Sequence, residues 1–154
     1  MKKEFDVMDG ERTLVKVRLE APKIKSTRPL LRKHESDAGW DIESIEDIVV
    51  SAQEFVPKIH TGVHLEIPDR YFGLIKERSS MAAQGVFVMG GVIDAGYRGE
   101  IMINLGNISG YDYVIKSGDR IAQIIFIPCD SDLTLEDELS ESDRGQGGFG
   151  STGR

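Results

Sequence analysis

The chain has 154 residues, of which 40% are hydrophobic and 29% charged, a composition that suits one globular domain with a single core. The formal net charge of −7 argues against attraction of the whole chain to nucleic acid, and no run approaches the roughly 20 apolar residues of a membrane helix. The single cysteine, Cys129, excludes an internal disulfide framework and a cysteine metal cluster. We interpret it as a small packed thiol in a reducing compartment.

The opening residues, MKKEFDVMDGER, lack the apolar segment of a secretory signal. We therefore expect a cytoplasmic protein, or one inside a host cell if its source is viral. Residues 12–33 are mostly basic, and residues 130–143 carry only acidic charges. Because the basic stretch has no interleaved aromatic residues, a solvated face is favoured there over a nucleic-acid patch.

Apolar and polar residues alternate along several short segments, which predicts half-buried strands. The alternation is clear in residues 13–20, 62–68 and 100–107, shorter in 47–57 and 71–77, and absent from 120–128, which are apolar on both faces. Only residues 79–85, SSMAAQG, look helical. Many short strands between Gly and Pro turns predict an all-β sandwich or barrel over residues 1–129, followed by a C-terminal arm over 130–154.

Two segments in the first half carry candidate polar sites. In ESDAGWDIES, Asp37 and Asp41 flank a Gly-Trp pair, and two carboxylates could support a magnesium ion or simply belong to a solvated turn. In GLIKERSSMAAQG, Arg78, Ser79 and Ser80 precede the helical turn, where they could bind an anion. The alternative is that Ser79 or Ser80 caps the helix.

Two further segments carry a candidate base and a buried amide. In GGVIDAGYRGE, Asp94 could be a general base with Tyr97 packed on a ring, or it could bond its own backbone in the turn. In GDRIAQIIF, Gln123 is polar within an apolar strand, so a structural hydrogen bond or a ligand contact is needed. The histidines have no metal-binding spacing, and His64 is expected to be solvated.

The chain ends with RGQGGFGSTGR, residues 144–154. GQGGFG matches a dinucleotide-binding pattern by letter, but no strand and helix surround it, so that assignment is rejected. Glycine N–H groups, hydroxyls and arginines suit a phosphate, and Phe149 offers a flat face to a base. The alternative is that the segment is disordered. The two interpretations are compatible if the segment is disordered when empty and becomes ordered when it binds a ligand.

These segments, in this order, resemble the five motifs of the homotrimeric dUTPase (dUTP pyrophosphatase) family. They read DAGWDIES, RSSMAAQG, GGVIDAGYRGE, GDRIAQIIF and RGQGGFGSTG, between Asp37 and Gly153. Trp40 stands where tyrosine is usual, and Val88 where many bacterial members have asparagine. The resemblance implies a distorted jelly-roll barrel with one short helix, and a homotrimer with active sites at subunit interfaces. It also implies that the C-terminal arm is a mobile lid over another subunit's site.

The implied reaction is magnesium-dependent hydrolysis of dUTP to dUMP and pyrophosphate, which keeps uracil out of DNA and supplies dUMP for dTMP synthesis. Asp94 would activate the water, Gln123 would orient it, and Asp41 would support Mg²⁺ through water. Tyr97 would stack on the deoxyribose and exclude a 2′-hydroxyl. The remaining residues implied to bind substrate are Arg78, Ser79, Ser80, Gly91, Val92, Ile93, Met102, Arg144, Phe149, Gly150, Ser151 and Thr152.

Two other functions remain open from the sequence. A dCTP deaminase shares the fold, but those enzymes typically lack a complete fifth motif such as RGQGGFGSTG. Some phage members of the dUTPase family also bind regulatory proteins, and a surface of this chain could do so without an inserted domain. No stable nucleic-acid or membrane partner is expected.

Overall fold

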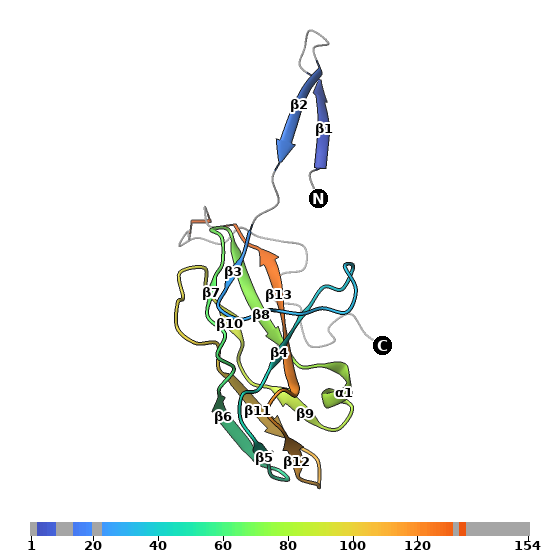
Figure 1. Ribbon diagram of the computed structural model, residues 1–154, viewed down its shortest axis with the longest axis vertical. Helices are drawn as coiled ribbons and strands as arrows, with labels where there is room; N and C mark the ends of the chain where they lie inside the picture. The colour runs from blue at the N-terminus through green and yellow to red at the C-terminus, as the bar shows by residue number, and fades with distance from the viewer. Residues whose placement is uncertain (1–2, 9–13, 20–22, 131–132, 135–154) are drawn as a thin grey trace, which may run out of the picture.

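A computed structural model describes residues 3–8, 14–19, 23–130 and 133–134. Its described part is built from short strands and one helical turn (Figure 1). The elements are β1 (Lys3–Met8), β2 (Leu14–Leu19), β3 (Lys25–Ser26), β4 (Trp40–Glu43), β5 (Ile48–Val50), β6 (Phe55–Ile59), β7 (Leu65–Glu66), β8 (Tyr71–Lys76), α1 (Ser79–Ala82), β9 (Val86–Val88), β10 (Val92–Ile93), β11 (Ile103–Asn107), β12 (Tyr113–Ile115) and β13 (Arg120–Pro128).

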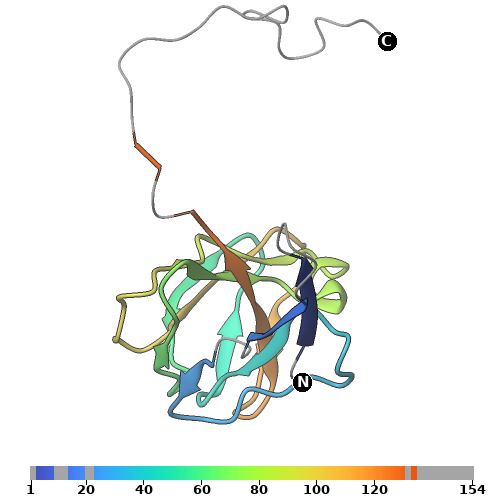
Figure 2. The ribbon, with the colours of Figure 1, turned by 90° about the horizontal axis from the view of Figure 1, so that it is seen from above.

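The strands of the barrel pair antiparallel in small sheets around one core (Figure 2). A four-stranded sheet has the order β10-β8-β13-β4, and a three-stranded sheet has the order β6-β11-β9. Two-stranded sheets, β12-β5 and β3-β7, complete the wall. This is the jelly-roll architecture that the motifs implied.

Period-two alternation correctly predicts which side chains enter the core, because successive residues of a strand face opposite sides. Val63, Leu65 and Ile67 are each at most 3% exposed, as are Ile101, Ile103 and Leu105. Residues 120–128 are apolar on both faces because β13 is a central strand, paired with both β4 and β8. The predicted helical turn is confirmed as α1.

Some local predictions were wrong. Residues 47–57 form two strands, β5 and β6, because a turn intervenes, in which Gln53 has a positive φ of 61°. Cys129 is exposed and not packed, because it follows the last residue of β13. Strands of two or three residues, such as β9, β10 and β12, carry too few residues for a visible period, and they were missed.

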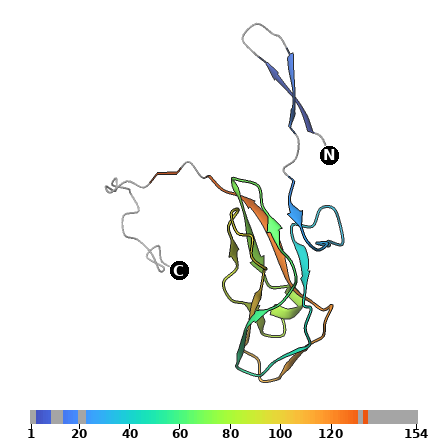
Figure 3. The ribbon, with the colours of Figure 1, turned by 60° about the vertical axis from the view of Figure 1, so that its left-hand side comes forward.

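The segment predicted from residues 13–20 is β2, and it pairs with β1 in a hairpin that the sequence did not predict. Phe5 lies opposite Val17, and Val7 lies opposite Val15. The hairpin stands clear of the barrel (Figures 1 and 3). The cations of residues 23–33 are exposed, which a solvated face and a nucleic-acid patch both require. Within the described ranges, no helix is long and apolar enough to cross a bilayer.

Candidate active site

A row of polar residues crosses the four-stranded sheet near the end of β8. Gln123 of β13 lies opposite Asp41 of β4 on one side and opposite Lys76 of β8 on the other. Directly opposed residues of antiparallel strands project from the same face. Positions far apart in the sequence are thereby brought onto one surface, which is where Arg78 also arrives, two residues after β8 ends.

Asp41 is held between two arginines. Its Oδ1 accepts a hydrogen bond from Arg78 Nε at 3.1 Å, and its Oδ2 accepts one from Arg120 Nη1 at 3.1 Å. Arg78 also donates to the Arg120 carbonyl oxygen at 3.3 Å. Two guanidinium groups on one carboxylate leave a local excess of positive charge, which suits a polyanion. We call Asp41, Arg78, Arg120 and Gln123 the arginine cluster.

Two members of the arginine cluster, Arg78 and Arg120, line a polar cavity of about 360 Å³ together with Asp119. Arg120 was not among the predicted site residues, although it lies within the GDRIAQIIF segment. The signal that could have identified Arg120 is its charge, because it lies in the same apolar strand as the candidate Gln123.

Helix α1 begins directly after Arg78. Arg78 itself is the N-cap, in an extended conformation, and no side chain caps the helix. The alternative that Ser79 or Ser80 is the cap is therefore wrong, because both already belong to the first turn. Both serines are exposed, and their hydroxyls make no hydrogen bond to another residue in the described part of the chain.

Gln123 makes a structural hydrogen bond, one of the two options that the sequence left open. Its Nε2 donates to the carbonyl oxygen of Glu77 at 3.1 Å. On the other side, Gly39 packs so closely that a Cβ there would overlap Gln123 Oε1. The amide is thus oriented by its neighbours and remains half-buried.

A second group of predicted residues surrounds the turn after β10. Gly91, whose φ is 116°, accepts a hydrogen bond from the Ile75 amide at 2.7 Å, so its carbonyl is bound to β8. The turn closes with a Tyr97 N–H donating to the Asp94 carbonyl oxygen at 3.1 Å. The Asp94 carboxylate is exposed and bonds to no described residue, so the self-bonded alternative for this side chain finds no support.

A cavity of about 400 Å³ lies beside this turn, and we call it the turn pocket. It brings together five predicted residues: Val92, Ile93, Asp94, Tyr97 and Met102. Pro57, Lys58, Glu100, Ile101 and Asn104 also line it, and they were not predicted. An unpaired carboxylate beside an aromatic ring and apolar side chains is an arrangement that could bind a nucleoside and activate water.

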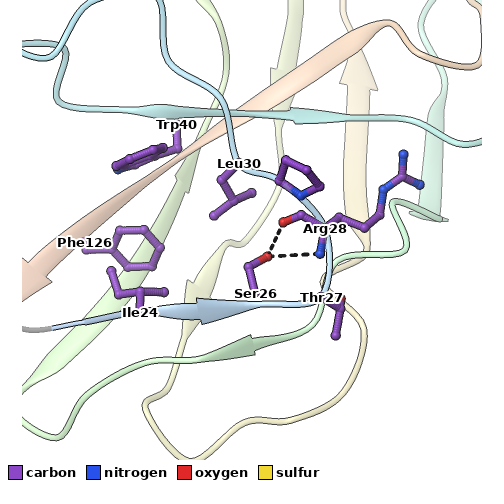
Figure 4. A pocket seen from close by; sticks show the side chains of 8 residues that line it. Ile24, Ser26, Thr27, Arg28, Leu30, Trp40 and Phe126 are labelled. Atoms are coloured by element: carbon purple, nitrogen blue, oxygen red, sulfur yellow. Dashed lines mark hydrogen bonds between the residues drawn. The ribbon is translucent and has the colours of Figure 1, made fainter.

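A further cavity, of about 580 Å³, lies elsewhere (Figure 4). Ile24, Leu30, Trp40 and Phe126 form its apolar wall, while Ser26 Oγ is occupied by a hydrogen bond to the Arg28 carbonyl oxygen. Among the described residues that line this cavity there is no carboxylate, and Arg28 is the one cation. Its size alone therefore does not make it the candidate catalytic site.

The arginine cluster and the turn pocket are separate within one chain. Three strand spacings separate Asp41 on β4 from β10, about 14 Å across the sheet. The register places Ile93 opposite Gly73, so Asp94 is displaced from the Asp41 row by about four residues, or about 13 Å along the strands. In Figure 1, the loop after β10 and helix α1 accordingly lie toward opposite ends of β8.

The described residues contain no group of three or more His, Cys, Asp or Glu side chains placed to hold a metal ion. Asp37, the other candidate carboxylate, accepts hydrogen bonds from His34, whose backbone N–H above all lowers the Asp37 pKa. It therefore stabilises its own turn. The predicted residues Arg144, Phe149, Gly150, Ser151 and Thr152 lie outside the described residues.

Comparison with known proteins identifies the family of this chain. The dUTPase family model matches residues 25–153. The chain belongs to the dUTPase family. The match spans all five segments that carried the resemblance, and it begins after the β1–β2 hairpin.

Individual relatives agree with this assignment. The deoxyuridine 5′-triphosphate nucleotidohydrolase of Paramecium bursaria Chlorella virus 1 is 42% identical over 132 residues, covering 84% of this chain and 93% of the viral protein. The Clostridium kluyveri protein of the same name is 40% identical over 124 residues, covering 78% and 86%. The dUTPase of Staphylococcus bacteriophage 80alpha, solved with dUpNHpp, has a TM-score of 0.76 and 32% identity, covering 86% of this chain and 99% of that one.

Proposed function

We propose that this dUTPase hydrolyses dUTP to dUMP and pyrophosphate, with Asp94 as the base, Mg²⁺ as the cofactor and active sites shared between the subunits of a homotrimer. Family membership supports the substrate and the reaction. The observation that carries the mechanism is the exposed Asp94 carboxylate, which faces the turn pocket with no partner among the described residues.

Asp94 is suited to take a proton from water. A free carboxylate is an acceptor, and a general base must reach the proton that it removes directly or through one water. As the proton moves to Asp94, the water oxygen bonds to the α-phosphorus. The bond from that phosphorus to the oxygen bridging to the β-phosphate breaks, and pyrophosphate leaves.

The arginine cluster is proposed to bind the triphosphate. Phosphoryl transfer depends mostly on positioning and charge neutralisation, and guanidinium groups match phosphate oxygens. Arg78 and Arg120 are already held in place by Asp41, so little ordering is needed on binding. Gln123 is proposed to meet the α-phosphate and to orient the water.

The residues present fit a magnesium ion held mainly by the substrate phosphates. Both oxygens of Asp41 already accept arginine hydrogen bonds, but a carboxylate has further lone pairs with which it can accept from metal-bound water. Bound Mg²⁺ would neutralise charge on the phosphates. Asp41 is therefore proposed as an indirect ligand.

Separation of the two groups supports a site shared between subunits. A base and a phosphate-binding arginine must meet at one phosphorus, and the sheet register keeps Asp94 and Arg78 too far apart within one chain. A second copy can supply the missing group. Residues 130–154 are proposed to act as an arm carrying Arg144, Phe149, Gly150, Ser151 and Thr152 onto the nucleotide, where closure excludes water.

The turn pocket is proposed to select the nucleoside. The backbone of Gly91, Val92 and Ile93 would meet the uracil edge, and Tyr97 would pack on the deoxyribose so that a 2′-hydroxyl does not fit. The apolar Met102 lines the same pocket. We place the reaction in the cytoplasm, or inside a host cell, in keeping with the single free cysteine.

The test is pyrophosphate release from dUTP, dCTP, dTTP and UTP in the presence of Mg²⁺, with EDTA as the control. Release from dUTP alone, abolished by EDTA, is the expected result. Equal release from UTP would contradict the proposed role of Tyr97, and full activity in EDTA would contradict the metal. Deamination of dCTP would favour the rival enzyme class.

A further inference from the structure

Glu100 follows the turn that carries Asp94 and Tyr97. Its carboxylate forms hydrogen bonds with the loop that follows β6. Glu100 Oε1 accepts hydrogen bonds from the backbone N–H groups of Thr61 at 3.0 Å and Gly62 at 2.7 Å. Its Oε2 lies 2.8 Å from His60 Nδ1. One side chain therefore bonds to three successive residues of the loop after β6.

The main chain of Glu100 bonds to Tyr97 at the same time. The Tyr97 hydroxyl donates to the Glu100 carbonyl oxygen at 3.0 Å. The ring lies over Gly99, where a Cβ would overlap the ring and its hydroxyl. Arg98 Nη1 closes the turn further by donating to the Ala95 carbonyl oxygen at 2.6 Å. The orientation of the Tyr97 ring thus depends on where Glu100 is held.

The loop that receives Glu100 is fixed to the core. Thr61 is 1% exposed, and its Oγ1 donates to the Ile101 carbonyl oxygen at 2.6 Å. The Ile101 amide in turn donates to the Val63 carbonyl oxygen at 2.8 Å. The carboxylate of Glu100 therefore joins an exposed turn to a rigid part of the barrel.

We propose that Glu100 is a positioning residue, which holds Tyr97 in the orientation that packs against the sugar of the substrate. The inference rests on the proposed role of Tyr97 in the turn pocket. Glu100 itself touches the reacting atoms in no step of the proposed mechanism. It acts through Tyr97, and its loss should weaken nucleotide binding and sugar discrimination more than the chemical step.

His60 adds a pH dependence to this contact. The hydrogen bond and charge of Glu100, together with the charge of Glu46, raise the His60 pKa above its ordinary value of 6.5. Backbone N–H groups and His60 lower the Glu100 pKa from 4.5, so Glu100 is ionised near neutrality. The charged pair is therefore complete between the lowered pKa of Glu100 and pH 6.5, and it is lost as the pH rises through the raised pKa of His60.

The decisive variants are Glu100→Ala and Glu100→Gln. Alanine removes all three side-chain contacts, so we expect about a tenfold rise in the KM for dUTP and a similar fall in the ratio of kcat/KM for dUTP over UTP, with kcat changed less. Glutamine can still accept both backbone hydrogen bonds and can donate to neutral His60. It should restore most of the discrimination at neutral pH.

Two further variants test the route through Tyr97. Tyr97→Phe keeps the ring but removes the bond to Glu100, so the dUTP/UTP ratio should fall by a smaller factor. Glu66→Ala removes a more exposed carboxylate, which pairs with Lys25 at 2.8 Å, and it should leave the ratio unchanged. Thermal melting of each variant establishes that it is folded.

The outcomes separate this inference from the proposed function. If the wild-type enzyme hydrolyses UTP as well as dUTP, the proposed role of Tyr97 fails. If the wild type discriminates and folded Glu100→Ala discriminates equally well, the positioning role of Glu100 is overturned. Should alanine prevent folding, an unchanged ratio in Tyr97→Phe overturns it in the same way.

The proposed pH dependence is tested with the variant His60→Gln. The KM of the wild type for dUTP should rise as the pH increases through the raised pKa of His60, and this rise should be absent from His60→Gln and Glu100→Gln. Ionisation of dUTP itself affects all three proteins equally and cancels in the comparison. An identical pH profile in the wild type and His60→Gln would contradict the proposed contribution of His60.

Discussion

The turn pocket and the arginine cluster are built in different ways. The turn pocket takes Asp94 and Tyr97, both exposed, from a local loop between β10 and β11, although β6 also contributes to its lining. The arginine cluster depends on cross-strand register, which places residues from β4, β13 and the end of β8 on one face. In the turn pocket, the Asp94 carboxylate has no partner among the described residues. In the arginine cluster, the Asp41 carboxylate has two arginine partners.

This difference indicates that the two carboxylates, Asp94 and Asp41, have different roles. A carboxylate without a partner can accept a proton, whereas a carboxylate between two arginines fixes them for an anion. Replacing an exposed, unpaired group should change activity without changing stability. Replacing a member of the cluster should change both, because each guanidinium has a protein partner to lose.

The largest expected effect is that of Asp94→Asn. Losing a general base typically lowers the rate by about two to four powers of ten. The melting temperature should not change, since the carboxylate is exposed and bonds to no described residue. Pyrophosphate release and thermal melting measure the two effects, with Asp69→Asn, another exposed turn aspartate, as the control. Unchanged turnover would remove Asp94 from its role.

Truncation before Arg144 tests the arm that is proposed to close over both groups. Losing several phosphate contacts should lower kcat/KM for dUTP by about a hundredfold or more. The buried core lies within residues 42–124, so the melting temperature should be nearly unchanged. A large fall in melting temperature would show instead that the tail stabilises the fold.

Arg78→Lys and Arg120→Lys are a matched pair within the arginine cluster. Lysine cannot reproduce the planar guanidinium contacts, so Arg78→Lys should lower kcat/KM by about tenfold. The side chain of Arg120 is 50% exposed, against 27% for Arg78, so Arg120→Lys should lower the melting temperature less than Arg78→Lys does. Steady-state kinetics and melting of both variants measure this. Equal and negligible kinetic effects would argue against phosphate binding by the cluster.

Gly39→Ala should have the smallest effect. The new Cβ would overlap Gln123 Oε1, so the flexible amide must move away from its present position. We expect a loss of several-fold in kcat and little change in KM, since Gln123 is proposed to orient the attacking water. Gly110→Ala, where a Cβ meets nothing within 4 Å, is the control. If both variants have wild-type kcat, the orientation of Gln123 is not important for turnover.

Local patterns predicted the fold well where they are long enough. The alternation around Val63 to Ile67 and Ile101 to Leu105 identified buried positions because side-chain direction follows from strand geometry alone. Short strands such as β10 were missed because two residues show no period. The cap of α1 was misplaced by one residue, since serine is a common cap but no side chain is used here.

The sequence predicted individual residues of the candidate site, but it did not predict which of them contact one another. Motifs identified Asp41, Arg78 and Gln123 separately, but the ion pair of Asp41 with Arg78 depends on sheet register between residues 37 positions apart. Arg120 and Glu100 lay within recognised motifs, and their partners are non-local in the same way. No single-segment pattern contains that information.

The central claim is that Asp94 and Arg78 of one active site come from different subunits. Mixing Asp94→Asn and Arg78→Ala chains tests it most directly: both are unfolded together, refolded together, and assayed for pyrophosphate release from dUTP beside each variant refolded alone. We predict that the mixture regains a substantial part of the wild-type turnover, because some sites then combine an intact Asp94 with an intact Arg78. A mixture that forms mixed oligomers and stays as inactive as its components would contradict the claim.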